Sequence, residues 1–210
     1  MLRVEIIGKL QAVFDELYSI GFPRTCAPFI AGGAIASLVL DEEPKDYDIW
    51  FPSLDAWEHA VNSLSLNHSW PTRQSKYSWT YTLPSGKIVQ LVKSRTGGPR
   101  KVVGTFDFQH TMSYFDGLQL VCDEEFIKSK ALTFVKGNLC HPVNTVQRLL
   151  KFSRRGYSIN NQTIADIMNE VGQIYCKVRD ERIADDDYDR VDDTIVFHPG
   201  YGGGGEDDSR

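Results

Sequence analysis

Two aspartates separated by one residue, Asp46 and Asp48, are the side chains in this sequence best suited to chemistry. They lie in residues 45–51, KDYDIWF, a run rich in strand-forming residues. Side chains at i and i+2 of a strand share a face, so both carboxylates should point away from Tyr47 and Ile49. Like charges at such a distance repel unless a cation lies between them. Oxygen ligands suit Mg²⁺ or Mn²⁺, so the pair predicts a divalent metal site.

A glycine pair precedes the aspartates. Gly32 and Gly33 follow a short apolar run and lead into a predicted apolar helix, and twelve residues separate Gly33 from Asp46. Glycine lets backbone amides approach a phosphate closely, and a helix N-terminus attracts anions. An ordinary turn and a solvated acidic strand are the alternative interpretations. The apolar residues 49–51 favour an internal strand, where unpaired carboxylates would be costly, and this cost favours the metal site.

A third carboxylate, Asp107, lies between two aromatic residues in the strand-like run Thr105-Phe106-Asp107-Phe108. If this run neighbours the strand of Asp46 and Asp48, Asp107 completes the metal cluster and accepts a proton from an attacking hydroxyl. The alternative is a cap or turn residue near Gly104. Asp116 is a second candidate, but Asp116-Gly117 is typical of a hairpin turn.

Basic side chains gather in two places. Arg148, Lys151 and Arg155 share one face of a helix predicted after Pro142, and they are candidates for neutralising the phosphates of a nucleotide. A solvated basic stripe on a surface helix is the alternative. The second group lies around a Gly-rich segment and is a candidate for binding the acceptor: Lys93, Arg95, Arg100 and Lys101.

The elements expected to position these residues follow from apolar periodicity and turn residues. They are a helix over residues 2–20, a strand over 27–31, a helix over 34–40, a strand over 47–51, a helix over 54–67, a hairpin of strands 77–83 and 88–92, strands 105–108 and 118–122, and helices after residue 142. This order predicts an α+β (α/β-like) fold, with a mixed sheet flanked by helices and a small C-terminal helical region. The alternating aromatics Tyr77, Trp79 and Tyr81 are expected to form a buried strand face rather than a stacking platform for bases.

The 210-residue chain divides by composition into three parts. We expect a core over residues 1–140, helices packed on it over 141–180, and an acidic, Gly-rich, mobile tail over 181–210. Residues 180–210 contain 11 acidic and 3 basic residues, whereas the rest has a net charge of +3, which is compatible with a phosphate-bearing substrate. The tail could alternatively be a partner-binding segment.

Other classes of protein are disfavoured. No apolar run is long enough to span a bilayer, and no basic leader precedes an apolar stretch, so we expect a cytoplasmic protein without a membrane partner. The four cysteines and five histidines show none of the close spacings typical of zinc sites. The sequence does not indicate the oligomeric state.

The glycine pair, the Asp-x-Asp strand and the later single aspartate resemble the DNA polymerase β-type nucleotidyltransferase superfamily, in particular its minimal, often phage-encoded members. The resemblance covers residues 29–157 and includes the run IVQLV at 88–92 and the helix around Lys151. It implies that Gly32 and Gly33 hold the triphosphate of an NTP. It also implies that Asp46 and Asp48 bind both metals and that Asp107 binds the catalytic one.

The resemblance implies transfer of a nucleoside monophosphate from an NTP to a hydroxyl of an RNA end, a nucleotide, a protein or a small molecule, in the host cytoplasm if the protein is phage-encoded. The alternative is a weakly active or inactive nucleotide-binding module. Two departures bear on the choice. Many members have Ser where this chain has Gly33, and residues 34–37 read AIAS where CCA-adding enzymes have an Arg-Asp pair.

Overall fold

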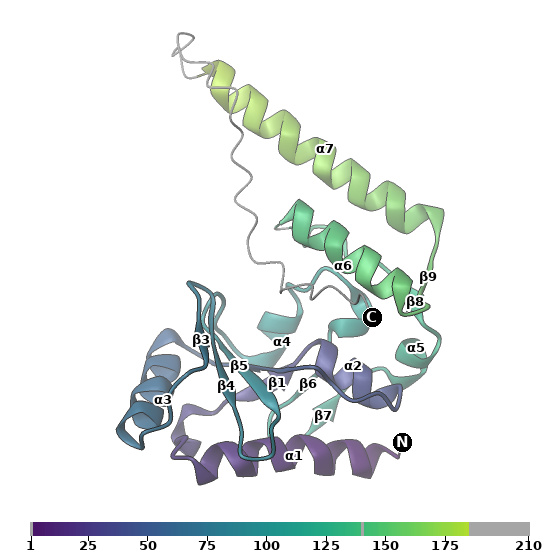
Figure 1. Ribbon diagram of the computed structural model, residues 1–210. Coiled ribbons are helices and arrows are strands. Elements are labelled where there is room, and N and C mark those ends of the chain that lie inside the picture. Colours follow the sequence, from purple (N-terminus) through teal and green to yellow (C-terminus); the bar gives the residue numbers. More distant parts are fainter. Residues whose placement is uncertain (1, 140, 185–210) are drawn as a thin grey trace, which may run out of the picture. The chain divides into compact units, whose positions relative to one another are not determined.

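The computed structural model describes residues 2–139 and 141–184, and the side chains of these ranges as far as residue 176 (Figure 1). The chain divides into two compact units, residues 1–133 and 134–210. Of the expected acidic tail, residues 181–184 belong to a helix and the rest lies outside the described residues. The expected boundary at residue 140 and the packing of the C-terminal helices on the core stay predictions. None of the described helices is long and apolar enough to cross a membrane.

The first unit contains a seven-stranded sheet with helices. Its helical elements are α1 (Arg3–Ser19), η1 (Arg24–Cys26), α2 (Gly33–Val39), α3 (Leu54–Leu66), α4 (Pro99–Val103), η2 (Gln109–Thr111) and α5 (Glu124–Lys128). Its strands are β1 (Phe29–Ala31), β2 (Tyr47–Trp50), β3 (Arg73–Gln74), β4 (Ser78–Thr82), β5 (Ile88–Val92), β6 (Tyr114–Phe115), β7 (Leu120–Val121) and β8 (Ala131–Leu132). The sheet order is β3-β4-β5-β2-β1-β6-β7, and β2 with β5 is its parallel pair. The predicted α+β fold with a mixed sheet is confirmed.

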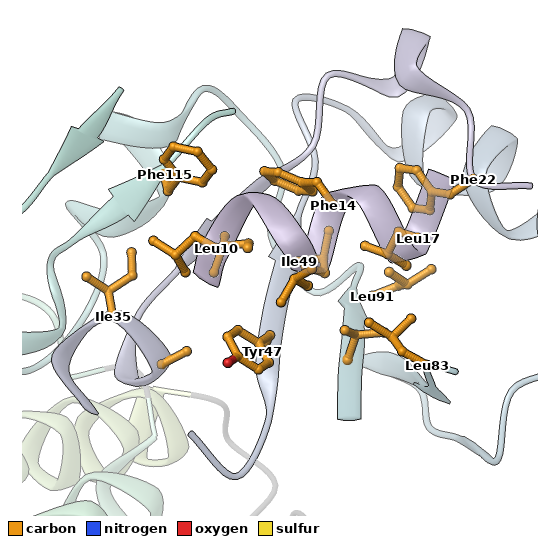
Figure 2. Packing of buried hydrophobic residues seen from close by; sticks show 14 of the residues in the cluster. Leu10, Phe14, Leu17, Phe22, Ile35, Tyr47, Ile49, Leu83, Leu91 and Phe115 are labelled. Carbon is orange, nitrogen blue, oxygen red and sulfur yellow. The ribbon is translucent and has the colours of Figure 1, made fainter. Parts of the chain in front are cut away.

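The main hydrophobic core lies on one face of this sheet. Tyr47 and Ile49 of β2 and Leu91 of β5 are buried against residues of α1, including Leu10 and Leu17 (Figure 2). The aromatic ring of Phe14 stacks on that of Phe115 at 5.8 Å between centroids. Because each fully buried large apolar side chain contributes about 1.5–3 kcal/mol, this face fixes which residues of β2 point inward.

A smaller cluster covers part of the opposite face. Phe29 and Ala31 of β1, Trp50 of β2, Val92 of β5 and Tyr114 of β6 pack there with the two valines of α4. The alternation of side chains along a strand therefore gives β2 two distinct faces. Ile49 points to the main core, and Trp50 points to the smaller cluster.

Two expected strands differ from the structure. Residues 105–108 form no strand of the sheet; between α4 and η2, Thr105 lies in a turn, Asp107 in a bend and Phe108 in an isolated β-bridge. Residues 118–122 contribute only the two-residue strand β7, which pairs with β6 as a hairpin. Asp116 makes the expected turn by accepting hydrogen bonds from the backbone N–H groups of Leu118 and Gln119.

The second unit contains α6 (Pro142–Arg154), β9 (Ser158–Ile159) and α7 (Asn161–Ala184). Pro142 stands at the first helical position of α6, where its missing N–H costs nothing. The Phe152 ring packs on Tyr157 at 5.3 Å between centroids. Three apolar residues of α6, Val143, Val146 and Leu150, are substantially exposed.

Candidate functional site

The acidic pair lies at an internal strand. Asp48 is the second residue of β2, and Asp46 comes directly before the strand. Both are half-buried, whereas Tyr47 and Ile49 are buried in the main core. This alternation puts the two carboxylates on the face opposite the main core. Burial raises the pKa of Tyr47 to about 12, so its hydroxyl stays protonated at neutral pH.

A glutamine of the neighbouring strand holds one of these carboxylates. In the parallel pairing of β2 with β5, Asp48 is level with Gln90, so the two side chains share a face. The Gln90 Nε2 donates a hydrogen bond of 2.8 Å to Oδ2 of Asp46. Sequence reasoning did not single out Gln90, although a lone polar residue in the apolar run IVQLV was a usable signal. The amide fixes the orientation of Asp46 on the shared face.

The glycine turn lies at the end of β1, which pairs with β2. Gly32 has a φ of +94°, a conformation that other residues rarely adopt, and its N–H donates to the carbonyl oxygen of Ser113 at 3.1 Å. A Cβ at Gly32 would lie 3.5 Å from the Phe106 ring, whereas one at Gly33 would meet no atom within 4 Å. Ile30 pairs with Ile49, so one further step of this antiparallel register brings Ala31 opposite Asp48. The glycine turn and the acidic pair are therefore neighbours in the sheet.

Asp107 is buried, with 7% of its surface exposed, on the bend that replaces the expected strand. The residue before it, Phe106, packs on the Trp50 ring at 5.5 Å between centroids. Arg95 Nη1 donates a hydrogen bond of 3.0 Å to the carbonyl oxygen of Thr105. These contacts hold the bend against the sheet face that carries Asp48 and Trp50, and close to Gly32.

The three aspartates do not form a ready-made metal cluster. Among the side chains of residues 2–139 and 141–176, no group of three or more His, Cys, Asp or Glu is arranged to hold a metal ion. Neither strand beside β2 offers a carboxylate: β5 offers the amide of Gln90, and β1 consists of the apolar residues Phe29–Ala31. Asp46 and Asp48 thus fit a cation whose remaining ligands come from elsewhere, such as phosphate oxygens of a substrate.

The predicted basic residues belong to two separate units of the chain. Arg148 and Lys151 are exposed on α6 and Arg155 ends it, so all three belong to the second unit. Lys93 lies over the Trp57 ring, with 4.8 Å between Nζ and the centroid. Arg95 is occupied with Thr105, whereas Arg100 and Lys101 are exposed on α4. The hydrogen bond from Arg95 to Thr105 therefore gives this Gly-rich segment a structural role.

The fold is shared with solved nucleotidyltransferases. The Thermotoga maritima CCA-adding enzyme complexed with tRNA is 16% identical over 81% of this chain and 46% of its own, with a TM-score of 0.54. A CCA-adding enzyme with CTP is 17% identical over 81% of this chain and 47% of its own, also at 0.54. The Bacillus stearothermophilus CCA-adding enzyme in complex with CTP is 15% identical over 78% and 42%, at 0.52. The chain thus spans less than half the length of these enzymes, and the likeness concerns the fold.

Family membership comes from the sequence of the first unit. The curated proteins give no match to this chain. A family model described as Gabija anti-defense 2 family protein (Gad2) matches residues 8–132, which include the sheet, the glycine turn and all three aspartates. Since this match covers more than half of the 210 residues, the chain belongs to the Gabija anti-defense 2 family.

Proposed function

We propose that this protein is a metal-dependent nucleotidyltransferase that transfers a nucleoside monophosphate from an NTP to a hydroxyl acceptor. The observation that carries the proposal is the acidic pair Asp46 and Asp48, which shares one half-buried face beside the turn of Gly32. Support also comes from the fold, which is similar to that of CCA-adding enzymes solved with CTP.

The proposed roles follow from the charges and positions of the residues. Asp46 and Asp48 would hold Mg²⁺ or Mn²⁺ together with phosphate oxygens, and Gln90 would keep Asp46 oriented. The bound cation would neutralise charge on the phosphates. Backbone groups at Gly32 and Gly33 would contact the triphosphate. Further neutralisation is assigned to three basic side chains of the second unit: Arg148, Lys151 and Arg155.

The reaction is an in-line displacement at the α-phosphorus. The acceptor hydroxyl oxygen forms a bond to that phosphorus, and the bond from the phosphorus to the bridging oxygen of the β-phosphate breaks, so that pyrophosphate leaves. We assign to Asp107 the removal of the hydroxyl proton, and, as a metal ligand, contact with the catalytic cation. Its burial beside Phe106 would shield it from competing water.

Similar enzymes bind tRNA, CTP and ATP, which supports an NTP and an RNA as partners. Residues 34–37 of this chain lack the Arg-Asp pair, so we do not propose CCA addition. We propose that the transfer serves the anti-defence action after which the family is named, in the host cytoplasm if the protein is phage-encoded.

A nucleotide-binding module without turnover is the second candidate. Two observations favour it: the described residues contain no three-carboxylate metal group, and Gly33 lacks the hydroxyl that many nucleotidyltransferases place there. Such a module would bind an NTP and regulate a partner.

Incubation with each of the four α-³²P-labelled NTPs, Mg²⁺ or Mn²⁺, and total RNA or protein extract tests the proposal. We expect one class of macromolecule or small molecule to become labelled in a metal-dependent way. Thermal stabilisation by NTP and Mg²⁺ without any label transfer would support the binding module. Neither stabilisation nor transfer, with any NTP, would contradict both functions.

The glycine turn provides a matched pair of variants. Gly32→Ala should destabilise the protein by about 1–2 kcal/mol, because a Cβ is disfavoured at positive φ. Gly33→Ser should leave the unfolding temperature unchanged, since its Cβ meets open space, and should strengthen NTP binding by adding a phosphate-binding hydroxyl. Thermal melts with and without NTP measure both effects. A Gly33→Ser protein that binds NTP more weakly than wild type would argue against a phosphate at this turn.

A further inference from the structure

A row of polar side chains crosses the sheet from the acidic pair to its edge. Asp48 is level with Gln90, Gln90 with Thr80, and Thr80 with Arg73. Residues that are level in neighbouring strands project from the same face, so these four side chains form one line over β2, β5, β4 and β3. The line begins at the candidate metal ligands and ends at an exposed arginine on the edge strand.

The sheet face around this row is open. Arg73 and Thr82 are exposed, Gln90 and Thr80 are half-buried, and Ile88 exposes 41% of its surface. The apolar cluster around α4, as far as the structure describes it, includes no residue of β3 or β4. On the opposite face of the same strands, Tyr81 and Leu91 are buried in the main core. An uncovered polar face next to a reaction centre is suited to an extended polar ligand.

The length of the row indicates a ligand larger than one nucleotide. Three strand spacings of about 4.8 Å separate Asp48 from Arg73, roughly 14 Å between their backbones. A stacked nucleic acid strand rises about 3.4 Å per nucleotide, so the row matches about four nucleotides. Gln90 and Thr80 offer an amide and a hydroxyl along the way, and Arg73 offers a cation for a phosphate.

An exposed tryptophan precedes the edge strand of this row. Trp70 exposes 66% of its surface in the segment that leads into β3, three residues before Arg73. Thr72 binds this segment to β4, because its N–H and its Oγ1 both donate hydrogen bonds to the backbone carbonyl oxygen of Thr80, at 2.8 and 3.2 Å. Exposed indole rings are preferred stacking partners for unpaired bases. Lys76, exposed in the following turn, adds positive charge.

We propose that this open face binds a single-stranded polynucleotide as the acceptor of the reaction. Its terminal hydroxyl would lie at Asp46 and Asp48, an upstream phosphate at Arg73, and an upstream base on Trp70. This inference rests on the proposed function, since it names the acceptor of the same site. A small hydroxyl compound would use only the acidic end of the row and would not reach Arg73.

Two variants that remove or move the charge of Arg73 test which face of the sheet binds the polynucleotide. Arg73→Gln removes the guanidinium, and Arg73→Gln/Gln74→Arg moves it by one residue, to the opposite sheet face, at unchanged composition and net charge. Binding of 5′-fluorescein-labelled 12-nucleotide single strands of RNA and DNA is measured by fluorescence anisotropy over a range of salt concentrations. Both variants should bind the strands more weakly than wild type. The slope of the logarithm of the binding constant against the logarithm of the salt concentration should also become shallower by about 0.7, as expected for the loss of one phosphate contact.

Trp70→Ala should weaken binding by roughly 5- to 150-fold, the loss of one base–aromatic stack. Unfolding temperatures identify any variant that is weakened by misfolding. Wild-type affinity of Arg73→Gln/Gln74→Arg, or absence of single-strand binding by the wild type, would overturn the proposal. Asp46→Asn/Asp48→Asn should still bind the strands, because it leaves Arg73 and Trp70 intact. If the wild type binds the single strands but transfers no label, the proposed catalysis is refuted and the polynucleotide-binding face is not. If it transfers label only to a small molecule or a protein, the polynucleotide acceptor is refuted and the catalysis is not.

Discussion

Asp46→Asn/Asp48→Asn should abolish the stabilisation of the protein by Mg²⁺ and NTP. A ligand present at 100 times its Kd stabilises the native state by about 2.7 kcal/mol, and this whole increment should be lost with the two carboxylates. The variant should fold as well as wild type without ligand, because the substitution removes like-charge repulsion and Asn can still accept the hydrogen bond from Gln90. Thermal melts with Mg²⁺, with NTP and with both measure the effect.

Asp41→Asn/Asp123→Asn is the matched control, since it also removes two carboxylates of the first unit. Asn tolerates the positive φ of residue 41, and it caps a helix as well as Asp does at residue 123, which accepts from the N–H of Phe126. This control should keep the full response to Mg²⁺ and NTP. An Asp46→Asn/Asp48→Asn protein that responds like the control would exclude metal binding by the acidic pair.

Asp107→Asn should slow transfer of the nucleoside monophosphate by roughly 10²–10⁴-fold, the usual effect of losing a positioned base. NTP binding should change little, since Asp46 and Asp48 would still hold the cation of the nucleotide. The measurement is label transfer under single-turnover conditions, beside NTP affinity from equilibrium binding. A rate loss without a binding loss is the signature of a group that acts in the chemical step.

Asp116→Asn is the control for this variant. Burial alone would raise the pKa of Asp116, but hydrogen bonds from Gln119 and Leu118 lower it, which assigns this carboxylate to its turn. Asn preserves the acceptor oxygen of the turn, so Asp116→Asn should transfer label at the wild-type rate. If Asp107→Asn also transfers label at the wild-type rate, Asp107 has no catalytic role. If the wild type itself shows no turnover and Asp107→Asn changes NTP affinity only slightly, the protein is the nucleotide-binding module.

The fold was predictable from the sequence wherever the spacing of apolar residues in a segment matches the set of residues that the segment buries. The spacing of Ile6, Leu10, Val13 and Leu17 places one face of α1 in the core. The hairpin of β4 and β5 follows from two alternating runs around Gly86, whose φ is +85°. In both cases the same residues determine the element and bury its apolar face, so the sequence pattern is sufficient.

The surroundings of Asp107 were not predictable in this way. Alternating aromatic residues at 106 and 108 indicate a strand, yet Phe106 packs on Trp50, Asp107 lies in a bend and Phe108 makes only an isolated β-bridge. Tertiary contacts override local propensity at such a short segment. The contact of Gln90 with Asp46 was also missed, because it depends on the order and register of strands 40 residues apart.

The parallel pairing of β2 with β5 determines when the site can form during synthesis. Within the described sheet, β2 meets β1 on one side, which precedes it in the chain, and β5 on the other, which follows it by about 40 residues. A nascent chain that has emerged only as far as α3 can pair Ile49 with Ile30, but Asp46 still lacks the amide of Gln90. The carboxylate of Asp46 can therefore acquire this hydrogen bond only after Gln90 has left the ribosome and β5 has paired with β2. Until then the nascent chain carries an acidic strand with one exposed edge, and its charge discourages pairing with other chains.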